Sequence, residues 1–253
     1  MILIAAALAE ELEIALNLCQ NRTPVKLAGV RAWTATRSGG TVTLLKTGVG
    51  PKRSEATLGL LLKNISPARI LILGYCGALD PGLKVGTMVV SQEASLLDDD
   101  SNTASSLENL PLAGTWALAE SSALYEKGIR AGLPLYRGTT LTAHHLLGNP
   151  ADKLTLYRRF QTAIVDMETA ALARAAAPFG IPTACVRAVS DEASDEFLAP
   201  FSYSPDATLA ARAVRILKAG NWIHRYSQWR ERATIARGNL RRFLVWYLDS
   251  YTQ

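Results

Sequence analysis

The stretch Thr183-Ala-Cys-Val-Arg-Ala-Val-Ser-Asp191 decides the fold of this 253-residue chain. Thr183 to Ser190 is a mainly apolar run, short enough for a buried strand, and such runs are typical of sheets covered on both faces. Asp191 falls at the carboxyl end of this strand, where the ligands of α/β sheets bind. The stretch therefore predicts a buried strand with an acid at its ligand-binding end.

Two other parts of the chain also place an acid after a predicted strand. A predicted strand over 163–166 leads into a helix that Glu168 opens, and an apolar strand over 1–7 leads into Glu11. Acids in the first turn of a helix also complement its dipole, so Glu11 taken alone fits either role. Because Glu11, Glu168 and Asp191 all follow predicted strands, a parallel or mixed sheet would bring the three acids to one rim.

Strands and helices alternate along most of the chain. Further strands are predicted over 25–36, 42–46, 69–73, 87–91 and 135–142, and helices over 10–19, 51–62 and 152–160. The polar stretch 98–112 is predicted to be a surface loop. This alternation indicates a three-layer α/β fold, with helices on both faces of a mixed, partly barrel-like sheet.

The composition excludes several classes of protein. No run of eighteen apolar residues occurs, and residues 1–8 lack a basic region, so neither a membrane span nor a signal peptide is expected. We therefore expect a cytoplasmic protein. The three cysteines (Cys19, Cys76 and Cys185) show no metal or disulfide spacing, so we expect no metal and no cofactor, inorganic phosphate remaining a candidate co-substrate.

The positive charge is concentrated in the last part of the chain. Residues 222–253 hold six arginines against Glu231 and Asp249, a surplus of four within a total net charge of +5. The remainder is nearly neutral, which argues against nucleic-acid binding. We expect a main domain over 1–220 and a basic aromatic extension over 221–253.

The extension has the spacing of an amphipathic helix. Apolar residues recur every three or four positions, at Ala233, Ala236, Leu240, Phe243, Leu244 and Tyr247. One interpretation is a helix docked on the body or on a partner subunit. A second is an interfacial helix on an anionic membrane, which would place 222–253 in peripheral contact with its inner face.

Three converging acids suit the cleavage of an N-glycosidic bond. In that reaction the sugar becomes cation-like, the departing base needs a proton, and a nucleophile must be held on the opposite face. Glycosidases acting on other sugars use carboxylate pairs as well, so the acids alone do not settle the substrate.

A set of motifs carries a resemblance to a known family. In this order and spacing they resemble the superfamily of purine nucleoside phosphorylases and methylthioadenosine/S-adenosylhomocysteine nucleosidases, over roughly residues 1–220. The motifs are Ala7-Leu-Ala-Glu-Glu11, Lys46-Thr-Gly-Val-Gly50, the segment from Gly74 to Ser91, Val165-Asp-Met-Glu168 and Arg187-Ala-Val-Ser-Asp191. The resemblance implies a homo-oligomer that acts on a purine nucleoside.

The resemblance also implies a role for each acid. Asp191 would protonate the purine at N7, Glu168 would bind the ribose hydroxyls beneath Met167, and Glu11 would activate water. One of His144 and His145, expected on a strand, would lie against the base. The full set of expected substrate-binding residues is Cys76, Gly77, His144, His145, Asp166, Met167, Glu168, Arg187 and Ser190.

The chain departs from the family pattern at the residues that would hold the nucleophile, phosphate or water. It lacks the Gly-Asp-Pro and Arg-bearing loop with which phosphorylases hold phosphate after the first strand. Tyr75 stands where a small hydroxyl residue is expected after Gly74. Water and phosphate therefore both stay open as nucleophiles.

Three interpretations of the substrate follow. The Asp166-Met167-Glu168 motif, the segment 149–153 and the Arg-rich extension resemble the hopanoid-associated phosphorylases, which implies release of adenine from adenosylhopane in hopanoid biosynthesis. The alternative is a soluble nucleosidase for methylthioadenosine, S-adenosylhomocysteine or futalosine, with a purely structural extension. Tyr75 motivates a third interpretation, a non-catalytic, membrane-associated nucleoside-binding protein.

Overall fold

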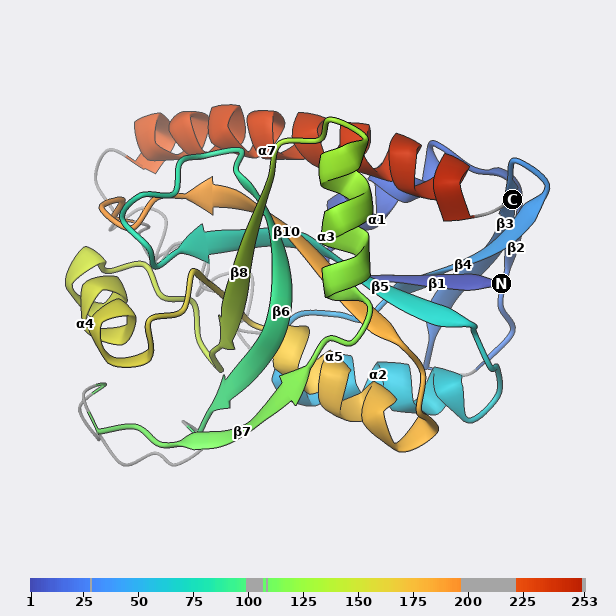
Figure 1. Cartoon of the computed structure of the whole chain (residues 1–253), viewed down its shortest axis with the longest axis horizontal. Helices are drawn as coiled ribbons and strands as arrows, with labels where there is room; N and C mark the ends of the chain where they lie inside the picture. The colour runs from blue at the N-terminus through green and yellow to red at the C-terminus, as the bar shows by residue number, and fades with distance from the viewer. Residues whose placement is uncertain (28, 99–106, 108, 197–221, 252–253) are drawn as a thin grey trace.

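The computed structural model describes residues 1–27, 29–98, 107, 109–196 and 222–251, the side chains of 222–230 excepted (Figure 1). Its elements, in chain order, are β1 (Ile2–Ala6), α1 (Ala9–Leu16), β2 (Gln20–Pro24), β3 (Arg31–Arg37), β4 (Gly40–Lys46), α2 (Pro51–Leu62), β5 (Arg69–Ala78), β6 (Met88–Leu97), β7 (Leu112–Ala117), α3 (Ser121–Arg130), β8 (Leu135–Thr142), α4 (Pro150–Phe160), β9 (Ile164–Asp166), α5 (Thr169–Ala176), a 3₁₀ turn (Ala177–Phe179), β10 (Thr183–Asp191) and α7 (Trp222–Tyr251).

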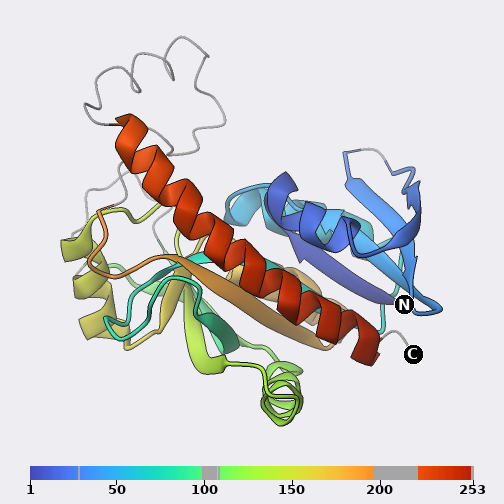
Figure 2. The same ribbon diagram turned by 90° about the horizontal axis from the view of Figure 1, so that it is seen from above.

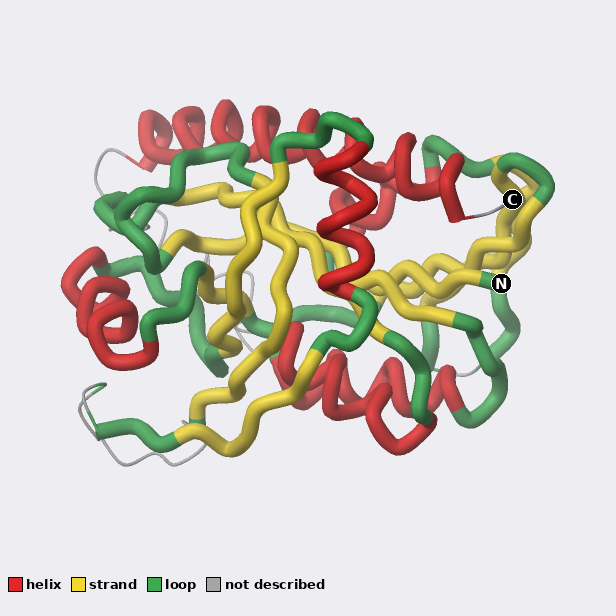
Figure 3. The backbone as a smooth tube through the Cα atoms, viewed as in Figure 1, coloured by secondary structure: helices red, strands yellow, loops and turns green. Residues whose placement is uncertain are grey.

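The sheet is mixed and partly closed. Strands β10, β6, β8, β9 and β5 pair in that order, and β10 also pairs with β5, so these five strands form a ring. From β5 the sheet continues through β1, β4, β3 and β2 (Figure 3). The pairs β1 with β5 and β5 with β10 are parallel, whereas β9 runs antiparallel to β5. The expected mixed, partly barrel-like sheet is confirmed.

Strand β5 shows why its sequence is apolar on both faces. Ile70 and Ile72 belong to the buried cluster that α2 and α5 cover. Leu71 and Leu73 alternate with them and belong to the opposite cluster, which α1, α3 and α7 cover. Side chains alternate between the faces of a strand, so two covering layers require an uninterrupted apolar run. The three-layer fold is thus confirmed, with one helical layer above and one below the sheet in Figure 1.

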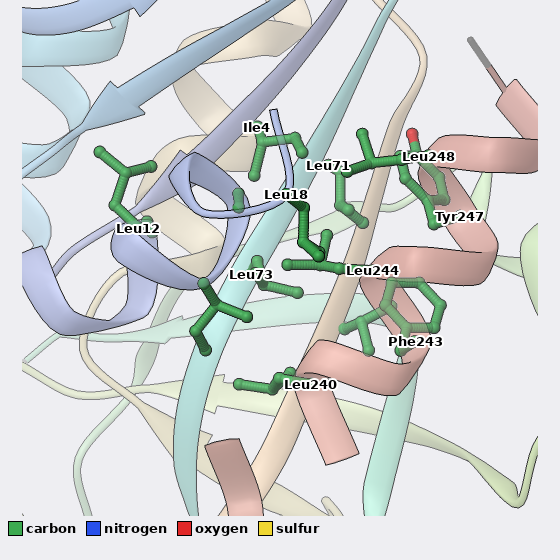
Figure 4. Packing of buried hydrophobic residues seen from close by; sticks show 14 of the residues in the cluster. Ile4, Leu12, Leu18, Leu71, Leu73, Leu240, Phe243, Leu244, Tyr247 and Leu248 are labelled. Carbon is green, nitrogen blue, oxygen red and sulfur yellow. The ribbon is translucent and has the colours of Figure 1, made fainter. Parts of the chain in front are cut away.

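Helix α7 is docked on the body along its described side chains. It crosses the molecule over β10 (Figure 2). Its apolar face packs against β1, β5, β10 and α1 (Figure 4), through Ala236, Leu240, Phe243, Leu244, Tyr247 and Leu248. At its last turn, Asp249 accepts two hydrogen bonds from Arg37, at 2.9 and 3.2 Å. The docked interpretation is confirmed for residues 231–251.

The apolar residues of this face are consequently not presented to a membrane. Phe243 and Tyr247, two aromatic residues of this apolar face, are 0% and 1% exposed. The side chains of 222–230 lie outside the described part. Within the described residues, no helix has the length and apolar character that crossing a membrane requires.

Several elements were not predicted from the sequence. Strand β2 has the sequence Gln-Asn-Arg-Thr-Pro and is exposed throughout, so no apolar pattern marks it. Strand β7 and helix α3 follow the polar stretch and were also missed. Strands β5 and β6 are longer than predicted, because both continue past their apolar runs to the rim of the sheet.

The docking of α7 can be tested by truncating its most buried aromatic side chain. Phe243→Ala should lower the free energy of unfolding by about 3–5 kcal/mol, because a buried ring is lost and a cavity is left. The control is Ile235→Ala on the same helix, where the side chain is 49% exposed and the cost should stay below about 1 kcal/mol. Urea unfolding measures both, and equal small effects would contradict a docked helix.

Candidate active site

A cavity of about 340 Å³ opens where several strands end. It lies at the carboxyl ends of β1, β5, β9 and β10, and Glu11, Glu168 and Asp191 all line it. The full lining is Ala7, Leu8, Glu10, Glu11, Val49, Tyr75, Cys76, Gly77, Leu146, Val165, Asp166, Met167, Glu168, Ser190 and Asp191. The sequence-based expectation that the three acids meet at one rim is confirmed.

Arg187 lies behind the cavity and is 1% exposed. Its Nη2 is 2.6 Å from Asp166 Oδ2 and 3.5 Å from Glu168 Oε2. It also donates to Thr169 Oγ1 at 3.0 Å and to the carbonyl of Tyr75 at 3.3 Å. A buried guanidinium needs such partners, because an unpaired charge is expensive to remove from water. Arg187 therefore joins β10 to the start of α5 and to β5.

Asp166 is occupied by protein groups on both of its carboxylate oxygens. Besides Arg187, it accepts hydrogen bonds from Thr142 Oγ1 at 2.7 Å, from the backbone N–H of Thr169 at 3.1 Å and from Thr169 Oγ1. We expected Asp166 to bind substrate. It lines the cavity, so a contact with substrate stays a prediction. Within the protein it fixes Arg187 and the first turn of α5, and thereby holds Glu168 in place.

Glu11 reaches the cavity from the first turn of α1. Its Oε2 accepts from the backbone N–H groups of Ala7 and Leu8, at 3.1 and 2.9 Å, and its Oε1 from that of Tyr75, at 2.8 Å. Burial raises the pKa of Glu11, against the opposing effects of Arg187 and the backbone donors. Glu11 is thus a rigid acceptor at the cavity wall that gains a proton more readily than an exposed glutamate does.

A glycine makes room for this arrangement. A Cβ atom at Gly74 would lie against Arg187 Nη1 and only 2.5 Å from Glu11 Oε1. Any side chain there would push apart the two charged groups, so the close approach of β5 to them requires glycine.

Glu168 caps the start of α5 and is buried. Its Oε1 accepts from the backbone N–H of Gly50 at 3.1 Å, and its Oε2 faces Arg187. Burial raises the pKa of Glu168 to about 8, and the nearby Asp166 and Glu11 act in the same direction. Near neutral pH it can therefore both donate and accept hydrogen bonds, which suits the recognition of a diol.

Asp191 has a partner that the sequence analysis did not identify. Lys153 of α4 places its Nζ 2.5 Å from Asp191 Oδ2, and Ser190 Oγ donates to Asp191 Oδ1 at 2.8 Å. Gly77 admits the carboxylate, since a Cβ there would lie 2.8 Å from Oδ2. In the sequence Lys153 stood out only as part of the helical segment 149–153. A lysine on a helix is ordinarily exposed, so nothing there indicated a buried partner of Asp191.

The remaining expected residues divide into two groups. Cys76, Gly77, Met167 and Ser190 line the cavity as expected. His144 and His145 do not lie on a strand, which corrects the prediction: β8 ends at Thr142, and the two histidines follow it in a bend. Leu146, which directly follows this bend, lines the cavity. A contact of either histidine with a base stays a prediction.

Tyr75 and Cys76 do not supply a reactive group. The Tyr75 side chain packs against the cluster that contains α7, and burial together with Glu11 raises its pKa. Burial also holds the pKa of the Cys76 thiol well above its usual range. Both side chains therefore stay protonated, and the chemistry of the cavity belongs to the carboxyl groups.

The chain matches a known protein family. The family model described as the phosphorylase superfamily matches residues 1–219. The chain belongs to the phosphorylase superfamily, and it is an enzyme of the nucleoside phosphorylase and nucleosidase class.

Solved structures show the same fold. One is a 5′-methylthioadenosine/S-adenosylhomocysteine nucleosidase from Helicobacter pylori, with a TM-score of 0.75 and 19% identity over 98% of this chain and 97% of that one. The corresponding nucleosidase from Neisseria meningitidis, in complex with methylthio-immucillin-A, gives 0.71 and 19% over 96% of both chains. Futalosine hydrolase from Helicobacter pylori gives 0.65 and 22% over 75% of this chain and 87% of that one.

The requirement for glycine at position 74 can be tested directly. Gly74→Ala should lower the free energy of unfolding by about 1–3 kcal/mol, because the methyl group displaces Arg187 or Glu11. Gly59→Ala, in the middle of α2, is the control: no atom lies within 4 Å of its added Cβ, and alanine there should stabilise by about 0.5–1 kcal/mol. Urea unfolding of both variants decides, and a neutral Gly74→Ala would show that the two charged groups have room to move.

The raised pKa of Glu168 predicts a pH-dependent stability. The folded state holds this proton more tightly than the unfolded state, so the stabilisation is complete below pH 4.5 and is lost as the pH rises through about 8. Glutamine has no such proton to lose, so Glu168→Gln should not show this loss. Between pH 4.5 and about 8, its free energy of unfolding relative to the wild type should rise with pH by up to about 1.4 kcal/mol per pH unit.

Urea unfolding at several values between about pH 5 and about pH 8 measures the difference. The exposed Glu126→Gln on α3 is the control and should leave the wild-type pH dependence unchanged. Parallel profiles for wild type and Glu168→Gln would contradict the raised pKa.

Proposed function

We propose that the protein cleaves the N-ribosidic bond of a purine nucleoside and releases the free base. The observation that carries the proposal is the convergence of Glu11, Glu168 and Asp191 on one cavity of about 340 Å³, a volume that suits a small ligand. The three acids come from different elements, the first turn of α1, the start of α5 and the end of β10, and line the same cavity.

Each step of the reaction has a group in this cavity. Breakage of the bond leaves positive charge on the ribose, and the surplus of carboxyl groups over Arg187 stabilises that charge. Glu168 binds the ribose hydroxyls, and Asp191 delivers a proton to N7 as the base departs. Glu11 positions the nucleophile and accepts a proton from it, a transfer that its raised pKa favours.

Water is the nucleophile that the charges favour. Five acids (Glu10, Glu11, Asp166, Glu168 and Asp191) are among the described residues lining the cavity, and no lysine or arginine is among them. A phosphate dianion would find no cationic side chain on that wall to pair with. Three basic residues, Arg31, Lys46 and Arg53, line a separate hollow of about 240 Å³ beside it, which is where phosphate would find positive charge. The dependence of turnover on phosphate tests the choice.

A small 5′-substituted adenosine is the substrate that the comparisons support best. The similar structures are nucleosidases for 5′-methylthioadenosine and S-adenosylhomocysteine, and a futalosine hydrolase. Adenosylhopane has no comparable support, because the described aromatic residues of the extension pack on the body instead of forming a lipid-facing surface. Assembly as a homo-oligomer stays a prediction from the family resemblance.

The experiment that tests the function is adenine release from a panel of 5′-substituted adenosines, each with and without phosphate. We expect release of adenine without phosphate from the small thio-substituted members. Release only with phosphate would make the enzyme a phosphorylase. Purine binding without any release would support the non-catalytic interpretation.

The role of Asp191 has its own prediction. Asp191→Asn should lower kcat for adenine release by about 10²–10⁴-fold, the usual contribution of general acid catalysis, with a smaller change in KM. The exposed Asp98→Asn is the matched control and should match the wild type. Unchanged turnover in Asp191→Asn would remove the assignment of the acid.

A further inference from the structure

Lys153 is the one lysine among the described residues whose side chain is wholly buried. It lies in the first turn of α4, a helix that Pro150 begins and that Asn149 caps by accepting from the backbone N–H of Ala151. Its side chain extends inward, where Nζ donates to Asp191 Oδ2 at 2.5 Å and to the carbonyl of Glu192 at 2.9 Å. The cation therefore lies directly behind the acid of the active site.

Removing this cation from water has a high desolvation cost, and stability alone does not explain why the pair is kept. An ion pair out of water often stabilises a fold no better than apolar side chains of similar volume, whereas its charges can serve chemistry. Asp191 is 13% exposed on the cavity side, while Lys153 is closed off from it. Any proton transfer between Lys153 and a bound ligand must therefore pass through Asp191.

The position of the proton follows from this pairing. Asp191 accepts from Lys153 Nζ on Oδ2. Ser190 Oγ lies 2.8 Å from Oδ1 and 3.1 Å from the carbonyl oxygen of Cys76, so these two oxygens share one hydroxyl proton. In the contact between Lys153 and Oδ2 the ammonium is the donor, so the proton of this contact is on Nζ.

We propose that Lys153 supplies, through Asp191, the proton that the departing purine takes up. This inference rests on the proposed function. As the bond between C1′ and N9 breaks, its electron pair stays on the purine and N7 takes a proton from Asp191. Asp191 takes one from Nζ and ends as the carboxylate that it was, and Lys153 is left as a neutral amine. Glu11 takes the proton released when water bonds to C1′, and once the base has left Lys153 regains a proton through Asp191 from the water that refills the cavity.

Lysine suits this role and arginine does not. A buried ammonium can lose its proton, whereas a guanidinium stays charged under all conditions in proteins. Replacement by arginine therefore separates the supply of a proton from the mere presence of a positive charge beside Asp191.

The experiment compares Lys153→Met and Lys153→Arg with Asp191→Asn on two substrates. One is the adenosine derivative that the wild type turns over best, and the other is p-nitrophenyl riboside, whose leaving group departs as a stable anion and needs no proton. Both Lys153 variants should lose about 10²-fold or more in kcat for adenine release, with KM little changed. Their loss on the nitrophenyl substrate should be at least tenfold smaller, as for Asp191→Asn.

Lys84→Met is the matched control. Lys84 pairs with Glu192 at 2.8 Å, next to Asp191 in the chain, but its side chain is 70% exposed. It should keep wild-type turnover of both substrates. If Lys153→Met does not fold, Lys153→Arg still tests the inference. It keeps a positive charge beside Asp191 but has no proton to give up.

Three results would overturn the inference. Wild-type adenine release by Lys153→Arg would show that a positive charge suffices, and equal losses on both substrates would show a structural role. A loss in Asp191→Asn without one in Lys153→Met would leave the proposed function standing and remove only Lys153. No cleavage by the wild type would instead remove the proposed function itself, and this inference with it.

Discussion

The buried position of the Arg187 guanidinium among three carboxyl groups is the constraint on which the site depends. One guanidinium faces Asp166 and Glu168 directly, and its charge also acts on Glu11. If all three acids were ionised, one positive charge would leave two negative charges uncompensated in a region nearly closed to water. Burial therefore shifts the balance toward protonation, which is the physical reason why Glu168 and Glu11 have raised pKa values. The same imbalance makes the cavity attractive to a ligand that develops positive charge.

Much of this architecture could be read from the sequence. The apolar runs of β5 and β10 indicated strands covered on both faces, and the position of Asp191 after its strand indicated the rim. Such signals are strong because burial on two sides admits few residue types. Strand β2 lacked any signal, since all of its residues are exposed and it is held by pairing with β3 alone. Sequence patterns report burial, so an element held by backbone hydrogen bonds at an edge leaves no trace.

The chemistry of the site was predictable only in part. Carboxyl groups at strand ends can be located by counting along the chain, but the partner of a carboxyl group depends on how distant elements pack. Lys153 shows this limit, because its helix looked like any exposed helix until α4 was placed against the end of β10. Asp166 shows it as well: it stands in the motif as a possible ligand of substrate, yet the structure engages both its oxygens internally. Local sequence specifies which groups are available, and tertiary packing specifies which of them are already occupied.

The docking of α7 has a consequence for the kinetics of folding. Its apolar face completes a core cluster that begins with Ile2 and Ile4 of β1, and its last turn pairs with Arg37, 212 positions away. Contacts between such distant segments slow folding, because a long loop must close before the contacts reward it. Until the helix arrives, the central strands present an uncovered apolar face that favours self-association. The segment that finishes the core thus sets the interval during which a newly made chain is most dependent on chaperones.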